Sequence, residues 1–178
     1  MAEEKKEPWL SYLALTTVIL AVCATLSTFK GGGYSTKSVI SQAQASDQWA
    51  FYQAKAIKGY LYQVQRDQMQ VELDGMPPDA TAARRDALLA RIADYDKKIK
   101  KYEQEKTVIQ QDARKLESTR DEASRHGQPF GVAVIFLQVA ILISSIAGLF
   151  KRKGLWLLAL PVGVAGLIYF ADGFFLFF

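Results

Sequence analysis

The chain has 178 residues, of which half are hydrophobic and 22% are charged. One histidine and one cysteine exclude an intramolecular disulfide and a metal site built from paired histidines or cysteines. The net charge is only +4, and residues 30–128 carry 17 Lys and Arg against 14 Asp and Glu. A nucleic-acid-binding protein usually shows a more one-sided excess, so we expect no nucleic-acid partner.

Three apolar runs predict transmembrane helices. The first, residues 9–29, holds no charged side chain and is long enough to cross a hydrocarbon core of about 30 Å. A cleavable signal peptide is the alternative interpretation. The spanning length and the acidic residues of the tail, residues 1–8, favour an uncleaved anchor. The second run covers residues 130–150, and the third, with an aromatic C-terminus, covers residues 155–178.

A short basic loop, residues 151–154, joins the last two runs and forces them to be antiparallel. Its three cations, Lys151, Arg152 and Lys153, are the topology determinants, because cations in short loops favour the cytoplasmic side. An equal number of cations flanks residues 30–128, but long segments are translocated largely regardless of charge. We therefore expect the loop in the cytoplasm and residues 30–128 on the opposite side.

The sequence pattern of residues 30–128 predicts an extramembrane helical hairpin. A flexible joint at residues 31–33 precedes the first helical arm. The first arm, about 42–73, has apolar residues at helical spacing. The breaker Asp74-Gly75-Met76-Pro77-Pro78 then ends the helix, and the second arm covers about 79–125. Apolar faces on both sides of one short breaker indicate antiparallel arms. The apolar residues of the first arm are Ala50, Ala54, Ile57, Leu61, Val64 and Val71, and Trp49, Phe51 and Tyr52 add an aromatic interaction motif.

The second arm carries the sharpest periodicity in the sequence. Its mainly apolar positions step by four and three without a slip, interrupted by the cations Lys106 and Arg120, which predicts coiled-coil packing. A polar residue in a coiled-coil core can fix register and oligomeric state, so we expect self-association. The predicted seam comprises Leu88, Ile92, Tyr95, Ile99, Tyr102, Lys106, Ile109, Ala113, Leu116, Arg120 and Ala123.

No catalytic constellation accompanies these elements. The sequence contains no P-loop, GxGxxG, GxSxG or HExxH motif, so we expect neither an enzyme nor a cofactor. Gln138 is the only strongly polar side chain of the second run, and Asp172 is the one acid embedded in an apolar run, so these two residues are the candidates for an intramembrane polar site. Asp172 lies about 18 residues past the basic loop, close to an interface. An ordinary interfacial role and an ion or proton pathway are both open.

The segment Trp49-Ala50-Phe51-Tyr52-Gln53-Ala54-Lys55, followed by Ile57-Lys58, resembles a motif of a bacterial membrane family, domain of unknown function 4337. Residues 133–150, the basic loop and Trp156 are similar to the closing hairpin of that family. The resemblance covers nearly the whole chain. It implies an integral membrane protein of unestablished activity and supplies no catalytic residue.

Together these features predict an all-α membrane protein with three transmembrane helices and an antiparallel coiled-coil hairpin between the first and second. The leading hypothesis is a non-enzymatic membrane scaffold or interaction subunit that self-associates through the coiled coil. Its partners would be the lipid bilayer and either further copies or another membrane-complex subunit. The alternative is a channel or transporter component. The expected location is the bacterial inner (cytoplasmic) membrane, with the hairpin in the periplasm.

Overall fold

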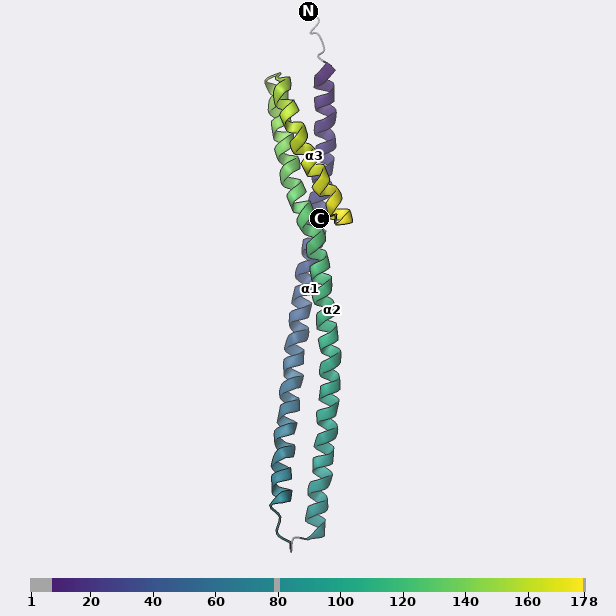
Figure 1. Cartoon of the computed structure of the whole chain (residues 1–178), viewed down its shortest axis with the longest axis vertical. Helices are drawn as coiled ribbons and strands as arrows, with labels where there is room; N and C mark the ends of the chain where they lie inside the picture. Colours follow the sequence, from purple (N-terminus) through teal and green to yellow (C-terminus); the bar gives the residue numbers. More distant parts are fainter. Residues whose placement is uncertain (1–7, 79–80, 178) are drawn as a thin grey trace, which may run out of the picture. The chain divides into compact units, whose positions relative to one another are not determined.

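The computed structural model describes residues 8–78 and 81–177, which form three α-helices and no strand. Each helix contains a stretch that is long and apolar enough to cross a membrane. The predicted all-α class is therefore confirmed. Most of the predicted tail (residues 1–7), the start of the predicted second arm (79–80) and Phe178 lie outside the described residues. The helices are α1, Pro8–Asp74, α2, Ala82–Leu149, and α3, Lys153–Phe175 (Figure 1).

Helices α1 and α2 each continue through a point where we expected an interruption. The prediction of a flexible joint at residues 31–33 is wrong, because α1 remains helical through all three glycines. Likewise α2 continues through Pro129, so the predicted boundaries at residues 29 and 128 do not coincide with helix ends. A Cβ added at Gly31 would lie 3.1 Å from Cβ of Phe130. Gly31 thus allows close approach of two helices rather than a hinge.

The chain divides into two compact units. The first, which we call the span unit, comprises residues 1–40 and 119–178, and the second, the hairpin unit, comprises Ser41–Ser118. The span unit contains the beginning of α1, the end of α2 and all of α3. The hairpin unit contains the end of α1, residues 75–78 and the beginning of α2. We describe each unit by itself.

The span unit is packed around small side chains and glycines. A buried cluster joins Leu20 of α1 to Leu137 of α2, with three alanines around them. Helix α3 approaches this cluster through Gly163 and Gly166. A Cβ at Gly163 would lie 3.2 Å from the Leu20 side chain, and one at Gly166 would lie 2.8 Å from that of Leu137. Small residues at such contacts favour helix association in lipid, where close packing replaces the hydrophobic effect.

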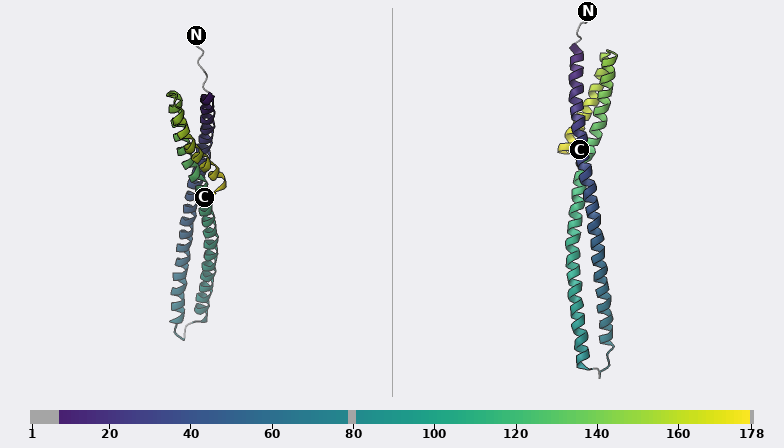
Figure 2. Two further views of the ribbon diagram at one scale, coloured as in Figure 1. Left: turned by 45° about the horizontal axis from the view of Figure 1, so that its top comes forward. Right: turned by 180° about the vertical axis from the view of Figure 1, so that it is seen from behind.

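The hairpin unit is an antiparallel pair of helical segments, which lie side by side in every view of Figures 1 and 2. Polar contacts join the early part of one segment to the late part of the other. Trp49 bonds to Glu117, and Lys55 pairs with Glu105. Near the turn, Glu72 pairs with Arg84. The segments reverse direction at residues 75–78, where the two prolines cannot continue α1.

Candidate interaction surfaces

The face of α2 that meets α1 is the row of residues predicted as a seam. All eleven positions are buried or half-buried, from Leu88 to Ala123. In the hairpin unit, Ile92 and Ile109 are 9% and 7% exposed and Ala113 is fully buried. The row therefore lies on the side of α2 that is withdrawn from solvent.

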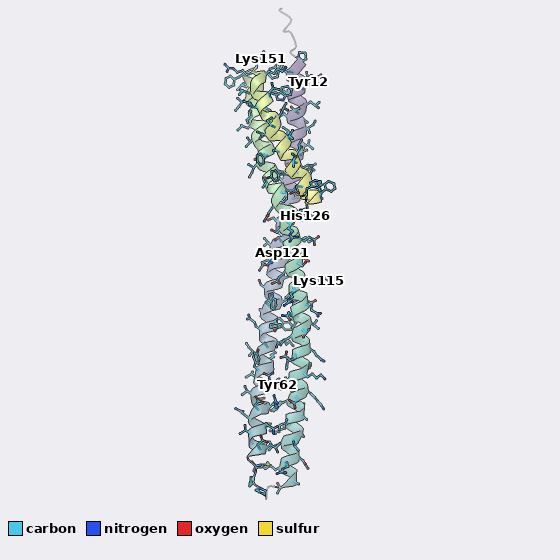
Figure 3. The ribbon with its side chains drawn as sticks, viewed as in Figure 1. Tyr12, Tyr62, Lys115, Asp121, His126 and Lys151 are labelled. Carbon is cyan, nitrogen blue, oxygen red and sulfur yellow. The ribbon has the colours of Figure 1, made fainter. Side chains whose placement is uncertain are left out.

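Aromatic stacking aligns the two segments of the hairpin unit near their middle. Tyr62, labelled in Figure 3, reaches from α1 toward α2, with its ring 5.7 Å from those of both Tyr95 and Tyr102. Gly59 leaves room for this arrangement, since an added Cβ there would lie 3.7 Å from Cβ of Tyr102. Aromatic pairs at this separation stabilise a fold by more than the burial of their apolar surface alone would provide.

Lys106 occupies a core position of the seam and is only 9% exposed. Its ammonium donates hydrogen bonds to both carboxylate oxygens of Glu103, at 2.8 and 3.1 Å. It also lies 5.5 Å from the ring centre of Tyr52 and 5.7 Å from that of Tyr60. The hydrogen bond to Glu103 raises the pKa of Lys106 above its ordinary value.

A second ion pair links the two segments directly. The ammonium of Lys55 lies 2.7 Å from a carboxylate oxygen of Glu105 and 5.1 Å from the ring centre of Phe51. The hydrogen bond from Lys55 lowers the pKa of Glu105 below its ordinary value. Because this pair joins α1 to α2, it helps to fix the register of the antiparallel segments.

The aromatic motif of the first arm divides between two surfaces. Trp49 donates its indole N–H to Glu117 at 2.9 Å, and its ring meets Tyr52 edge-on at 5.6 Å. Both of these side chains are half-buried. Phe51 is 51% exposed. The three residues therefore do not form one exposed patch, and Trp49 instead tethers α1 to α2.

The apolar row of the first arm does not face α2, which corrects the simple picture of two apolar faces packed together. Its large members are among the most exposed hydrophobic residues of the hairpin unit. Ile57, Leu61, Val64 and Val71 are 60, 59, 55 and 71% exposed. Ala50 and Ala54 are exposed as well. This row, which we call the outer row, lies on the side of α1 that α2 leaves uncovered.

A different row of α1 faces α2, and its composition conceals it in the sequence. It mixes small, aromatic and charged residues, including Ala45, Gly59 and Arg66, all buried or half-buried. The available signal was a second four-three repeat, displaced by two residues from the outer row. Bulky seam residues such as Tyr102 occupy the core, so α1 supplies small side chains and ring faces opposite them. The row comprises Ser41, Ala45, Gln48, Tyr52, Lys55, Gly59, Tyr62, Arg66, Met69 and Leu73.

In the span unit, Asp172 is 2% exposed, and it accepts hydrogen bonds from backbone groups at the C-terminal end of its own helix. One carboxylate oxygen accepts the backbone N–H of Phe177 at 2.6 Å, and its carbonyl oxygen accepts that of Leu176 at 2.7 Å. Gln138, the other predicted intramembrane polar residue, is exposed on the surface of α2. The structure thus does not bring the two together, and it gives Asp172 a capping role at the end of α3.

His126 belongs to the same end of the span unit. Its Nδ1 lies 2.8 Å from the carbonyl oxygen of Gly173, and its ring stacks on Tyr34 at 5.0 Å. The imidazole therefore joins all three helices of the unit. Gly173 lies 47 positions away in the chain, so no local sequence pattern indicates this contact.

The predicted topology determinants lie at the opposite end of the span unit from His126, and Lys151 is labelled there in Figure 3. Lys151 and Arg152 follow the end of α2, and Lys153 begins α3. All three are exposed. Lys151 has a left-handed backbone, with φ of 50°, which helps to reverse the chain within so short a link.

Within residues 8–78 and 81–177, no group of three His, Cys, Asp or Glu side chains is placed to hold a metal ion. The geometry defines a class: an all-α protein with three helices able to span a membrane. The chain belongs to the family described as domain of unknown function (DUF4337), whose model matches residues 9–176. No curated protein and no solved structure matches the chain.

Proposed function

We propose that this protein is a non-enzymatic membrane scaffold or interaction subunit that associates with further copies of itself. The observation that carries the proposal is the two-sided character of α1 in the hairpin unit. One side is occupied by α2, whereas the outer row remains apolar and exposed. Contiguous exposed apolar surface on a segment outside lipid generally marks a place of contact with another macromolecule.

The span unit supports the membrane part of the proposal. Large apolar side chains cover its outside, including Leu15, Val22 and Leu26 of α1, which are 58, 53 and 46% exposed. Such a surface is unfavourable in water and suited to lipid tails. We place the protein in the bacterial inner membrane with the hairpin unit in the periplasm, on the strength of the cationic link at residues 151–153.

A channel or transporter component is the alternative, and it would need polar groups along a path through the bundle. The buried polar groups described for the span unit support it poorly. Asp172 caps α3, and the hydroxyl of Ser27 donates to the carbonyl oxygen of Cys23 in its own helix at 2.8 Å. Gln138 lies on the outside. We therefore favour the interaction role.

Two measurements on the full-length protein test this proposal. Native mass measurement in nanodiscs should give a particle that contains more than one copy, and a strictly monomeric particle would refute self-association. Ion flux through purified protein in liposomes should not exceed that of protein-free liposomes. Selective flux that is lost on replacing Asp172 with Asn would instead establish the alternative.

A further inference from the structure

We infer that the outer row of α1 is the docking surface for a second copy of this chain, and that the two α1 helices pair in parallel and in register. This inference rests on the proposed function and specifies its contact. All six residues of the outer row are exposed, and so is Gln68, which occupies the remaining position of the same four-three repeat between Val64 and Val71.

The spacing of the outer row indicates what kind of partner it fits. Its positions step by four and three over three heptads, and a helix with the same repeat is the surface that interdigitates with such a row. Two copies in one membrane present this repeat to each other in the same direction. A two-fold axis between them gives a closed contact in which each residue of the row meets its own counterpart.

The second face available for self-association is the outside of α2, and it is charged. Exposed cations and acids are interspersed there, so the outside of α2 is a solvated charged surface and not an apolar row into which a second helix could pack. The contrast within one unit selects α1 as the side on which a second copy docks. The exposed charged residues of α2 in the hairpin unit are Arg84, Arg85, Asp86, Arg91, Asp94, Asp96, Lys97, Lys100, Lys101, Glu103, Asp112, Arg114 and Lys115.

The flanks of the outer row are compatible with a like copy. In a parallel pair, Asp67 of one copy would approach Glu72 of the other, which is unfavourable for unpaired acids. Both acids already have a cationic partner within the chain: Asp67 lies 3.1 Å from Arg66, and Glu72 lies 2.9 Å from Arg84. Other flanking side chains are apolar in part: Phe51, at the start of the row, is 51% exposed, and Tyr60, near its middle, is 58% exposed.

Gln68 gives the contact its register. Its position in the four-three repeat is that of a core residue, and its amide both donates and accepts hydrogen bonds. Two Gln68 side chains that face each other satisfy one another, whereas an apolar residue opposite would leave the amide without a partner. A single polar core residue of this kind specifies alignment at some cost in stability.

The size of the row explains why the contact belongs to membrane-anchored copies. From Ala50 to Val71 the row is about 32 Å long, and a helix is about 10 Å wide. Its footprint is therefore on the order of 300 Å² on each copy, below the standard of about 800 Å² per partner. Anchoring in one membrane raises the effective concentration of the second copy, so a short contact is sufficient.

Cysteine crosslinking in native membranes tests the pairing, in full-length protein with Cys23 replaced by Ala. Leu61→Cys and Gln68→Cys should each give a disulfide-linked dimer on oxidation. The control, Lys100→Cys on the outside of α2, should not. Two positions seven residues apart both crosslink to their own counterparts only when the helices run parallel and in register. Crosslinking of one position alone would overturn the parallel arrangement.

Matched charge substitutions provide the second test. Val64→Lys should weaken dimerisation on the order of a hundred-fold, because each copy loses an apolar contact and gains an opposed charge. Leu89→Lys on α2 is the control, since Leu89 is 47% exposed and Val64 is 55% exposed. It should leave the dimer intact. Under conditions that dissociate the parent into single copies, thermal unfolding of both variants should match that of the parent, because neither side chain is buried within a single copy.

The possible outcomes separate this inference from the proposed function. Oligomeric protein without crosslinks in the outer row would overturn the inference and leave the scaffold role in place. A row that crosslinks only to a different protein would overturn the choice of a second copy. A monomeric particle in nanodiscs and in native membranes would overturn both.

Discussion

The ring of Phe130 lies directly over Gly173, where an added Cβ would come within 2.8 Å of three ring carbons. Phe130 is fully buried and also meets Phe174 edge-on at 5.0 Å. The glycine therefore provides the space that this ring occupies, and the contact joins α2 to α3 in the span unit.

Replacing Gly173 with Ala should consequently destabilise the span unit by ~1–3 kcal/mol, the usual cost of overpacking a dense core. Gly131→Ala is the control, because a Cβ added there meets nothing within 4 Å. Alanine favours a helix over glycine by about 0.5–1 kcal/mol. The control should therefore melt at or above the parental temperature. Tryptophan fluorescence during heating in a mild detergent measures both variants, and an unchanged melting temperature for Gly173→Ala would contradict the contact.

Disulfide trapping should verify the antiparallel alignment of the hairpin unit. The Cβ position of Gly59 lies 3.7 Å from that of Tyr102. This separation matches the mean of about 3.8 Å between the Cβ atoms of a disulfide. In a Cys23→Ala background, Gly59→Cys with Tyr102→Cys should oxidise within one chain. Gly59→Cys with Lys100→Cys should not, because Lys100 lies exposed on α2. Only intermolecular products from the first pair would show that the segments are not folded back on each other.

Sequence periodicity located the seam of α2 because bulky apolar side chains repeat there at strict helical spacing. It could not assign the faces of α1, since Ala45, Gly59 and Arg66 do not read as a core row. Their burial follows from the size of the residues opposite, such as Tyr102. Nor could it foresee that α1 continues through residues 31–33, because glycine permits both a joint and close helix packing. The bond between His126 and Gly173 joins residues that are 47 positions apart, beyond any local pattern.

The charge of Lys106 should be dispensable for stability. A cation that is 9% exposed pays a desolvation cost that its bonds to Glu103 only partly offset. Lys106→Leu should therefore raise the free energy of unfolding by ~1 kcal/mol, because leucine at this core position carries no charge to desolvate, while Glu103, whose side chain is 51% exposed, remains solvated. Lys106→Glu should lower it, because a second carboxylate would face Glu103 and the ring of Tyr52. Thermal unfolding compares the three proteins, and a lower melting temperature for Lys106→Leu would show that the cation contributes net stability.

The ion pair between Lys55 and Glu105 should make stability depend on pH in acid. Because Lys55 lowers the pKa of Glu105, the folded state binds this proton less readily than the unfolded state does. The stabilisation is present above the unfolded pKa of a glutamate, about 4.3, and is lost as the pH falls through the lower folded value. The melting temperature of the parent should exceed that of Glu105→Gln at neutral pH. The difference should shrink as the pH falls through the lowered pKa of Glu105, and a difference that stays constant from neutral pH into acid would exclude the linkage.

The last prediction concerns orientation in the membrane. Lys151, Arg152 and Lys153 occupy the link between α2 and α3, where cations act most strongly on topology. The link should therefore face the cytoplasm and the hairpin unit the periplasm. Five cations, the three of the link with Lys5 and Lys6, lie on the predicted cytoplasmic side, and five others flank residues 30–128. The flanking cations carry less weight, because long segments are translocated largely regardless of charge.

A cysteine at Ser118, which is exposed on α2, reports the side of the membrane on which the hairpin unit lies. In a Cys23→Ala background, a membrane-impermeant thiol reagent should label Ser118→Cys in intact spheroplasts. A cysteine in the link, at the exposed Lys151, is the matched control and should react only after lysis. The reverse pattern would place the hairpin unit in the cytoplasm. The pairing of two copies through the outer row would remain possible there, because both copies would project from the same face of the membrane.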